Sequence, residues 1–164
     1  MKTIVLILML LPISMLAQKG NDVFGKFTTA ENAIIKGTSM AHHFENQIEI
    51  TNLDANNTNN NAVVKFSMPI GNASAIFRDA FNSKKKLRSG EITVKSHFEE
   101  NNIIYIINLE DISVEACTDG IGITSLQLRA TRICWTYFSR DRMGKITTTK
   151  SGWDSRAEKP WTVL

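Results

Sequence analysis

The sequence has few of the residues that build metal centres and reactive sites. Among its 164 residues, the histidines and cysteines are His42, His43, His97, Cys117 and Cys134. A zinc site needs three or four histidine, cysteine or carboxylate ligands at a recognisable spacing, and these residues match no such pattern. Adjacent histidines on an extended segment would also point to opposite sides. We therefore predict no metal site and no cofactor.

Sequence motifs for catalysis are missing as well. The chain contains no Gly-x-Ser-x-Gly turn and no glycine-rich phosphate-binding loop. Its adjacent acidic pairs, Glu99 with Glu100 and Glu110 with Asp111, lie near predicted strand ends or turns, where solvation explains them. We predict that the protein is not an enzyme, and we nominate no catalytic residue. A hydrolase whose acids meet from separate strands remains an alternative.

The chain also lacks a large excess of one charge sign. Its formal net charge is +3, and lysines and arginines are interleaved with aspartates and glutamates. A nucleic-acid-binding domain usually has a concentrated basic face. We therefore predict no nucleic-acid partner.

A long apolar run occurs at the amino terminus, over residues 4–16, preceded by Lys2 and followed by Ala17. This order is typical of a secretory signal peptide. The run is shorter than the about 20 residues of a transmembrane helix, and Pro12 interrupts it. We predict a cleaved signal over residues 1–17 and one domain over 18–164, secreted or periplasmic and not stably inserted in a membrane. An uncleaved amino-terminal anchor is the alternative.

The two cysteines are predicted to be free thiols, although an exported chain invites a disulfide. Cys117 lies in one arm of a predicted hairpin whose turn covers residues 118–124, and it faces a residue near Leu126. Cys134 lies roughly eight residues farther along the other arm. At about 3.3 Å per strand residue, this separation exceeds the reach of a disulfide.

Short runs of alternating apolar and polar residues predict a mainly β protein. They cover residues 23–27, 33–36, 47–53, 62–68, 91–98, 102–109 and 112–117, and a longer run covers 125–138. In the longer run the apolar positions change parity near Thr131 and Arg132, which predicts a β-bulge of one extra residue. Because barrel strands bend in this way, a small β-barrel is favoured over a flat sheet.

One segment, residues 71–83, has helical spacing instead. Apolar side chains recur three and four residues apart at Ala73, Ile76, Phe77, Ala80 and Phe81. Asn72 or Ser74 can cap the start of a helix. We predict a single amphipathic helix that packs on the sheet.

A basic run follows the predicted helix. It comprises Lys84, Lys85, Lys86 and Arg88. Positive charge is favourable at the carboxyl end of a helix because of the helix dipole. The run is either a solvated loop or an electrostatic contact surface for a neighbouring subunit or an acidic cargo.

Two further polar segments are set apart by composition. Residues 53–61 are rich in asparagine and predict a loop between strands. The carboxyl-terminal segment places Trp153 and Trp161 among polar residues. Exposed tryptophans are unfavourable unless they dock, either on their own barrel or on a neighbouring subunit.

The order of these segments resembles the Hcp family, whose members form the inner tube of the bacterial type VI secretion system. The resemblance rests on IKGTS at 35–39, QIEI at 47–50, AVVKFSMPI at 62–70, the helix, EITVKS at 91–96, IIYIINLEDISV at 103–114, ICWTYF at 133–138 and GWD at 152–154. It runs from about Val23 to Trp153. The set of segments in this order is fairly specific, although no single motif is unique.

The resemblance implies a small Hcp-like β-barrel with one helix, six copies of which close into a ring. Such rings stack into a hollow tube, carry effectors, and meet sheath and spike proteins. Candidate subunit or cargo contacts are His42, His43, Phe44, Lys84, Lys85, Lys86, Arg88, Trp153, Asp154 and Trp161. Typical members carry no cleavable leader, so an exported β-barrel that binds a ligand or surface stays the alternative function.

Overall fold

The computed structural model describes residues 20–58, 61–97 and 102–163. The predicted signal peptide, residues 1–17, lies outside the described residues. The acidic pair of Glu99 and Glu100 lies outside them too.

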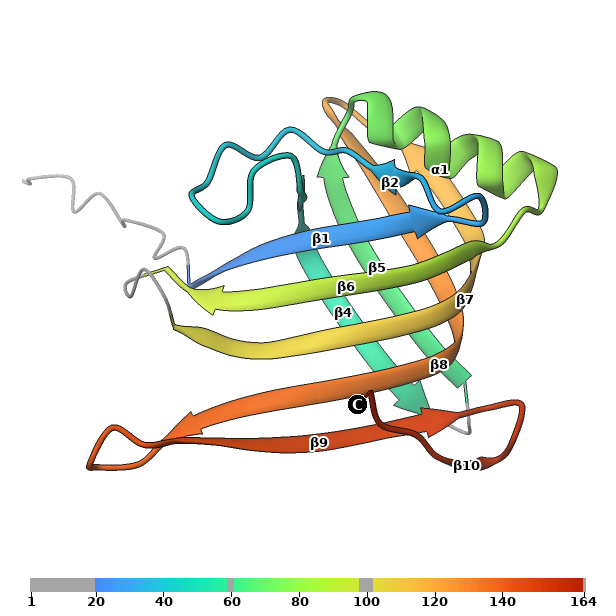
Figure 1. Ribbon diagram of the computed structural model, residues 1–164. Helices are drawn as coiled ribbons and strands as arrows, with labels where there is room; N and C mark the ends of the chain where they lie inside the picture. Colours follow the sequence, from blue (N-terminus) through green and yellow to red (C-terminus); the bar gives the residue numbers. More distant parts are fainter. Residues whose placement is uncertain (1–19, 59–60, 98–101, 164) are drawn as a thin grey trace, which may run out of the picture.

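The described chain folds into strands and one helix (Figure 1). The strands are β1 (Asn21–Thr29), β2 (Ile34–Ile35), β3 (Ile48–Glu49), β4 (Thr51–Thr58), β5 (Asn61–Pro69), β6 (Leu87–Ser96), β7 (Ile103–Asp119), β8 (Ile123–Arg140), β9 (Ile146–Asp154) and β10 (Lys159–Pro160). The helix α1 spans Asn72–Ser83 and lies across one end of the sheet (Figure 1).

The strands close into a barrel through antiparallel pairs. Strand β1 pairs with β6 on one side and, at Phe24 and Gly25, with β3 on the other. The chain continues from β3 into β4, which pairs with β5, and β5 pairs with the first part of β8. Strand β8 pairs with β7, and β7 returns to β6. The prediction of a mainly β barrel with one helix is confirmed.

The asparagine-rich segment is a strand for most of its length, so the prediction of a loop over residues 53–61 was wrong. Residues Thr51–Thr58 form β4, which pairs with β5 from Asp54 to Thr58. Leu53 and Ala55 pack against the buried core, and the apolar strand β5 supplies the partner hydrogen bonds. Local polarity alone therefore misplaced this element, because its pairing partner decided its conformation.

The long strands β7 and β8 turn a corner together. Leu128 and Ala130 are buried before the corner, and Ile133 is buried after it, so the predicted change of face is confirmed. The predicted extra residue near Thr131 and Arg132 was wrong, because the pairing with β7 keeps one register from Arg132 to Ala130. The register shifts on β7 instead, between Val114 and Ala116.

The corner changes the partner of β8. Strand β5 pairs with Ile123–Ala130, and β9 pairs with Arg132–Arg140 along the same edge. The first half of β8 therefore belongs to the barrel wall. Its second half forms a hairpin with β9 and stays paired with β7 from Arg132 to Tyr137, so only the residues after Tyr137 extend past the pairing with β7 (Figure 1).

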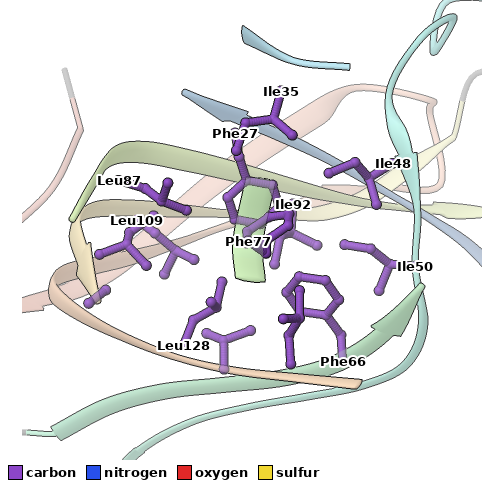
Figure 2. Close-up of a cluster of buried hydrophobic side chains, with 14 of the residues drawn as sticks. Phe27, Ile35, Ile48, Ile50, Phe66, Phe77, Leu87, Ile92, Leu109 and Leu128 are labelled. Carbon is purple, nitrogen blue, oxygen red and sulfur yellow. The ribbon is translucent and has the colours of Figure 1, made fainter. Parts of the chain in front are cut away.

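The core fills the barrel with aliphatic and aromatic side chains (Figure 2). At its centre, Phe27 packs edge-on against Phe77, with the ring centroids 5.3 Å apart. The Phe27 ring also lies over Gly90, where an added Cβ would be 2.6 Å from the ring. Glycine at this position therefore makes room for the aromatic centre of the core.

The helix confirms the predicted segment but not every predicted contact. Ala73, Phe77 and Ala80 are buried against the barrel, whereas Ile76 and Phe81 remain 36% and 38% exposed. The helix begins after Gly71, whose backbone N–H donates to the Ser74 hydroxyl at 3.1 Å. Ser74 rather than Asn72 therefore supplies the side-chain contact at the start.

Both cysteines are free thiols, as the spacing argument predicted. Cys117 lies opposite Leu126, and Cys134 lies opposite Asn108 on the same strand pair. Cys134 is fully buried.

Candidate subunit and partner contacts

The two histidines lie in the exposed turn between β2 and β3. His43 has a positive φ of 67°, so the turn brings both imidazoles to one side, with ring centroids 3.8 Å apart. The expectation that adjacent histidines would point apart was wrong, because the segment is not extended. His42 Nδ1 lies 3.5 Å from Glu45 Oε1. Within the described residues, no cluster of three or more histidine, cysteine or acidic side chains could hold a metal ion.

Phe44, the third candidate in this turn, anchors the turn to the barrel. Its ring stacks on Phe24 with the centroids 4.4 Å apart, and Lys95 Nζ lies 5.8 Å from its centroid. Phe44 thus holds the turn in place, while the histidine rings remain available to a partner.

The basic run after α1 mostly contacts the barrel itself. Lys84 ends the helix in the left-handed conformation, with a φ of 54°. Lys85 Nζ lies 3.9 Å from Glu31 and Lys86 Nζ lies 2.9 Å from Asp111, while the Arg88 guanidinium donates to the Asn32 side chain. The charges of Lys85 and Lys86 are therefore balanced by acids of the same chain, whereas the partner of Arg88 is uncharged, so the field available to an acidic partner is reduced but not removed.

The carboxyl-terminal segment docks on its own barrel. The Trp161 backbone N–H donates to the Gly152 carbonyl at 3.1 Å, and β10 pairs with β9 at Trp153 and Asp154. A side chain at Gly152 would collide with the backbone carbonyls of Ile133 and Trp161. Glycine here lets the terminal segment approach the strand closely.

Trp161 also covers charged side chains on the outer face of the sheet. The Arg132 guanidinium lies 5.9 Å from the centroid of its ring, within the range of a cation–π contact. Lys150 Nζ donates to the Val163 carbonyl at 2.5 Å. Trp161 therefore docks on its own barrel, which is one of the two alternatives that the sequence left open.

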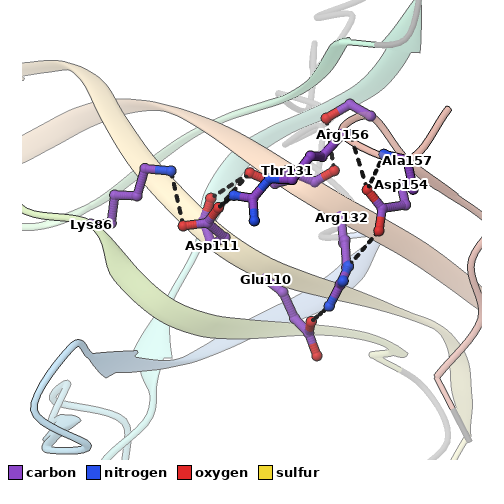
Figure 3. A network of polar contacts seen from close by, with 9 residues as sticks. Lys86, Glu110, Asp111, Thr131, Arg132, Asp154, Arg156 and Ala157 are labelled. Atoms are coloured by element: carbon purple, nitrogen blue, oxygen red, sulfur yellow. Dashed lines mark hydrogen bonds and ion pairs between the residues drawn. The ribbon is translucent and has the colours of Figure 1, made fainter.

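Asp154 joins the terminal segment to the sheet (Figure 3). One carboxylate oxygen accepts the backbone N–H groups of Arg156 and Ala157 at 3.0 Å, and the other accepts Arg132 Nε at 2.7 Å. The hydrogen bond from Arg132, followed by the backbone donors, lowers the pKa of this carboxyl below its ordinary value of 3.8. Asp154 is 3% exposed, so its contacts are structural.

A second carboxylate, Asp111, ties three elements together at the corner of β7 (Figure 3). It lies 2.9 Å from Lys86 Nζ, 2.6 Å from Arg156 Nη2 and 2.8 Å from the Thr131 hydroxyl. The hydrogen bond from Lys86 is the main cause that lowers the pKa of Asp111 below 3.8. Glu110 beside it accepts Arg132 Nη1 at 2.9 Å. Both acids of this adjacent pair are thus bound in ion pairs.

Sequence reasoning missed an exposed surface on the second half of β8 and on β9. Tyr137 is 46% and Ile146 is 56% exposed. Among the described residues, the edge of β9 over Ile146–Thr149 that faces away from β8 has no paired strand. The signal was present in residues 133–138 of β8, where apolar side chains occupy both parities, as in strands covered on both faces.

The arrangement provides contact surfaces with open hollows. One of about 610 Å³ lies between the end of α1, at Phe81 and Lys84, and strand β7 at Val114. One of about 260 Å³ lies between the β2–β3 connection and the start of α1, and one of about 240 Å³ lies beside Trp161. In the described part of the chain, no helix is long and apolar enough to cross a membrane.

Comparison with known proteins links this architecture to solved structures. No protein-family model matches the chain, and no curated protein matches its sequence significantly. Hcp1 from Salmonella typhimurium superposes with a TM-score of 0.69 and 20% identity over 87% of this chain and 99% of Hcp1. A type six secretion system protein gives a TM-score of 0.69 at 16% identity, covering 85% of this chain and 99% of that one.

The secreted protein Hcp3 from Pseudomonas aeruginosa gives a TM-score of 0.61 at 15% identity. That match covers 79% of this chain and 97% of Hcp3. The resemblance read from the order of segments is thereby confirmed at the level of structure. The fold of this chain is that of the Hcp proteins.

Proposed function

We propose that the chain is a structural subunit of a type VI secretion-type tube, and that six copies close into rings. The observation that carries this proposal is the structural match to Hcp1 from Salmonella typhimurium, which covers 87% of this chain and 99% of Hcp1. Stacked rings would carry effector cargo and contact sheath and spike proteins. The role is structural and requires no catalytic residue.

The surface of the described chain supports a subunit role. Exposed Tyr137, together with the open edge of β9 over Thr147–Thr149, offers apolar and backbone groups that a neighbouring copy could cover. An unpaired strand edge readily pairs with another chain. A head-to-tail contact between two different surfaces closes into a ring when its rotation divides a full turn.

A second candidate function is an exported β-barrel that binds a ligand or surface without forming an injection tube. The apolar run at residues 4–16 supports it, because a leader would send the chain to the periplasm or the exterior. The docked state of Trp161 limits the surface that this alternative can use.

The test is the mass of the chain from Gln18 onward in solution, measured by light scattering over a range of concentrations. Negative-stain images of the same sample show the shape of any assembly. Particles of six subunits with a central hole support the tube proposal. A monomer at every concentration would contradict it and favour the exported binding barrel.

A further inference from the structure

The tip of the β8–β9 hairpin combines exposed cations with exposed apolar side chains. The tip is defined here as residues 140–146, with the sequence RDRMGKI. Met143 at its apex is 94% exposed, and Ile146 at its base is 56% exposed. Arg140, Arg142 and Lys145 are exposed, and none of them forms an ion pair with another described residue. One acid, Asp141, leaves the tip with an excess of two positive charges.

The turn at the tip is an ordered structure. The Asp141 carboxylate accepts the backbone N–H groups of Met143 and Lys145 at 2.8 and 2.9 Å. Gly144 has a positive φ of 81°, and its N–H donates to the Asp141 carbonyl at 3.0 Å. These bonds fix Met143 at the apex, clear of the rest of the chain.

Apolar surface continues at the base of the tip. A cleft of about 200 Å³ lies beside Ile146 and is lined by Ile103 and Phe138. Its exposed lining is mainly apolar, with Arg140 at the border. Cations thus flank an apolar surface that extends from the hairpin to the start of β7.

The tip lies at the end of the sheet where the described chain begins. Asn21 opens β1 opposite Ser96 at the end of β6, and Ile103 opens β7 opposite Lys95. Arg140 ends β8 opposite Ile146 at the start of β9.

We propose that the hairpin tip docks on an anionic phospholipid surface. Met143 and Ile146 would enter the headgroup region, while Arg140, Arg142 and Lys145 bind lipid phosphates. The contact is peripheral, and the barrel stays outside the bilayer. It is distinct from the proposed ring and does not depend on it.

The shape of the tip favours lipid over an acidic protein as the partner. A convex turn with Met143 at its apex, Ile146 at its base and cations between them fits a soft surface of uniform negative charge, as amphipathic membrane-binding segments do. An acidic protein would need a concave site of matching shape.

The experiment measures co-sedimentation of the chain from Gln18 onward with lipid vesicles. The described residues of this chain close into a barrel around their own core, so the leader can be omitted. One vesicle type contains phosphatidylcholine alone, and the other also contains phosphatidylglycerol. Binding to the anionic vesicles alone, weakened by added salt, is the expected result.

Three variants separate the tip from general charge effects. Since each cation near an anionic surface contributes on the order of a fivefold change in affinity, Arg142→Glu with Lys145→Glu should weaken binding by more than about 20-fold. Met143→Ser should weaken it less. The matched control, Lys36→Glu with Lys65→Glu, reverses two exposed cations elsewhere, one directly after β2 and one on β5, and should leave more of the binding intact.

Two results would overturn the proposal. Wild-type protein that binds neither vesicle shows that the tip does not recognise lipid, and an acidic protein becomes the partner to seek. Equal losses of vesicle binding in the hairpin and control variants would show that the net charge of the protein, and not the hairpin tip, determines binding. Circular dichroism and light scattering of each variant check that the fold and the ring mass are unchanged.

Discussion

The closed barrel and the hairpin extension use the same long strand in opposite ways. The hairpin extension is defined as residues 137–150, none of which is buried. Before the corner, β8 has β5 and β7 as partners and contributes Leu128 to the packed core. Beyond it, β8 stays paired with β7 as far as Tyr137 and gains β9 as its other partner, and the first residues of β9 have no partner on their outer edge within the described chain. Stability is therefore concentrated in the barrel, and the extension is left for contact with other molecules.

The largest loss of stability is expected in the barrel, from Phe77→Ala. Phe77 is fully buried and packs on Phe27, so its removal leaves a cavity that should cost about 3–5 kcal/mol. The matched change in the extension, Tyr137→Ala, should cost much less because Tyr137 is 46% exposed. Urea denaturation of both variants measures the two free energies of unfolding. Similar losses would contradict the proposed division between the regions.

The boundary between the regions should be the next most sensitive place. Gly152→Ala would place a Cβ against the backbone of Ile133 and Trp161, and overpacking of this kind costs about 1–3 kcal/mol. The terminal segment should detach, which limited proteolysis with trypsin after Arg156 would detect. Gly120→Ala is the control, because its Cβ would have only ordinary contacts, the nearest at 3.6 Å. Equal protease resistance in both variants would show that the close approach is unimportant.

Acid should weaken the same boundary. The pKa of Asp154 is lowered in the folded state. Its ionised carboxylate therefore stabilises the fold fully at pH values above 3.8, the ordinary pKa of this group. That contribution is lost as the pH falls through the lower folded pKa, because the unfolded chain binds the proton first. The free energy of unfolding should therefore decline with acid below about pH 4. In Asp154→Asn this decline should be smaller, and an unchanged pH profile would contradict the assignment.

The smallest effect on stability is expected from the exposed candidate contacts. His42→Ala with His43→Ala should change the free energy of unfolding by no more than about 0.5 kcal/mol, because both side chains are exposed. The mass of the assembly is the informative measurement for this variant. A ring that persists would remove these histidines from the candidate subunit contacts, whereas a lower mass would support their role.

Prediction from sequence was most accurate where one short pattern determined the structure. The period-two runs, the helix near residues 72–83 and the position of Cys117 opposite Leu126 all followed from local spacing. The candidate contacts were harder to predict. Trp161 and Asp154 bind their own barrel. The exposed hairpin tip did not stand out in the sequence, because its exposure depends on which other elements lie beside it.

The sequence by itself determined the class of fold, since alternating apolar residues can bury only one face and therefore require a second layer or a closed barrel. It also determined the free thiols and the order of segments shared with Hcp proteins. Only the tertiary structure decided that the asparagine-rich segment pairs as β4, that two histidines stack in a turn, and that β8 changes partner at the corner. These outcomes depend on contacts between residues far apart in the chain. A local sequence pattern does not determine which distant segment a strand or turn will pack against.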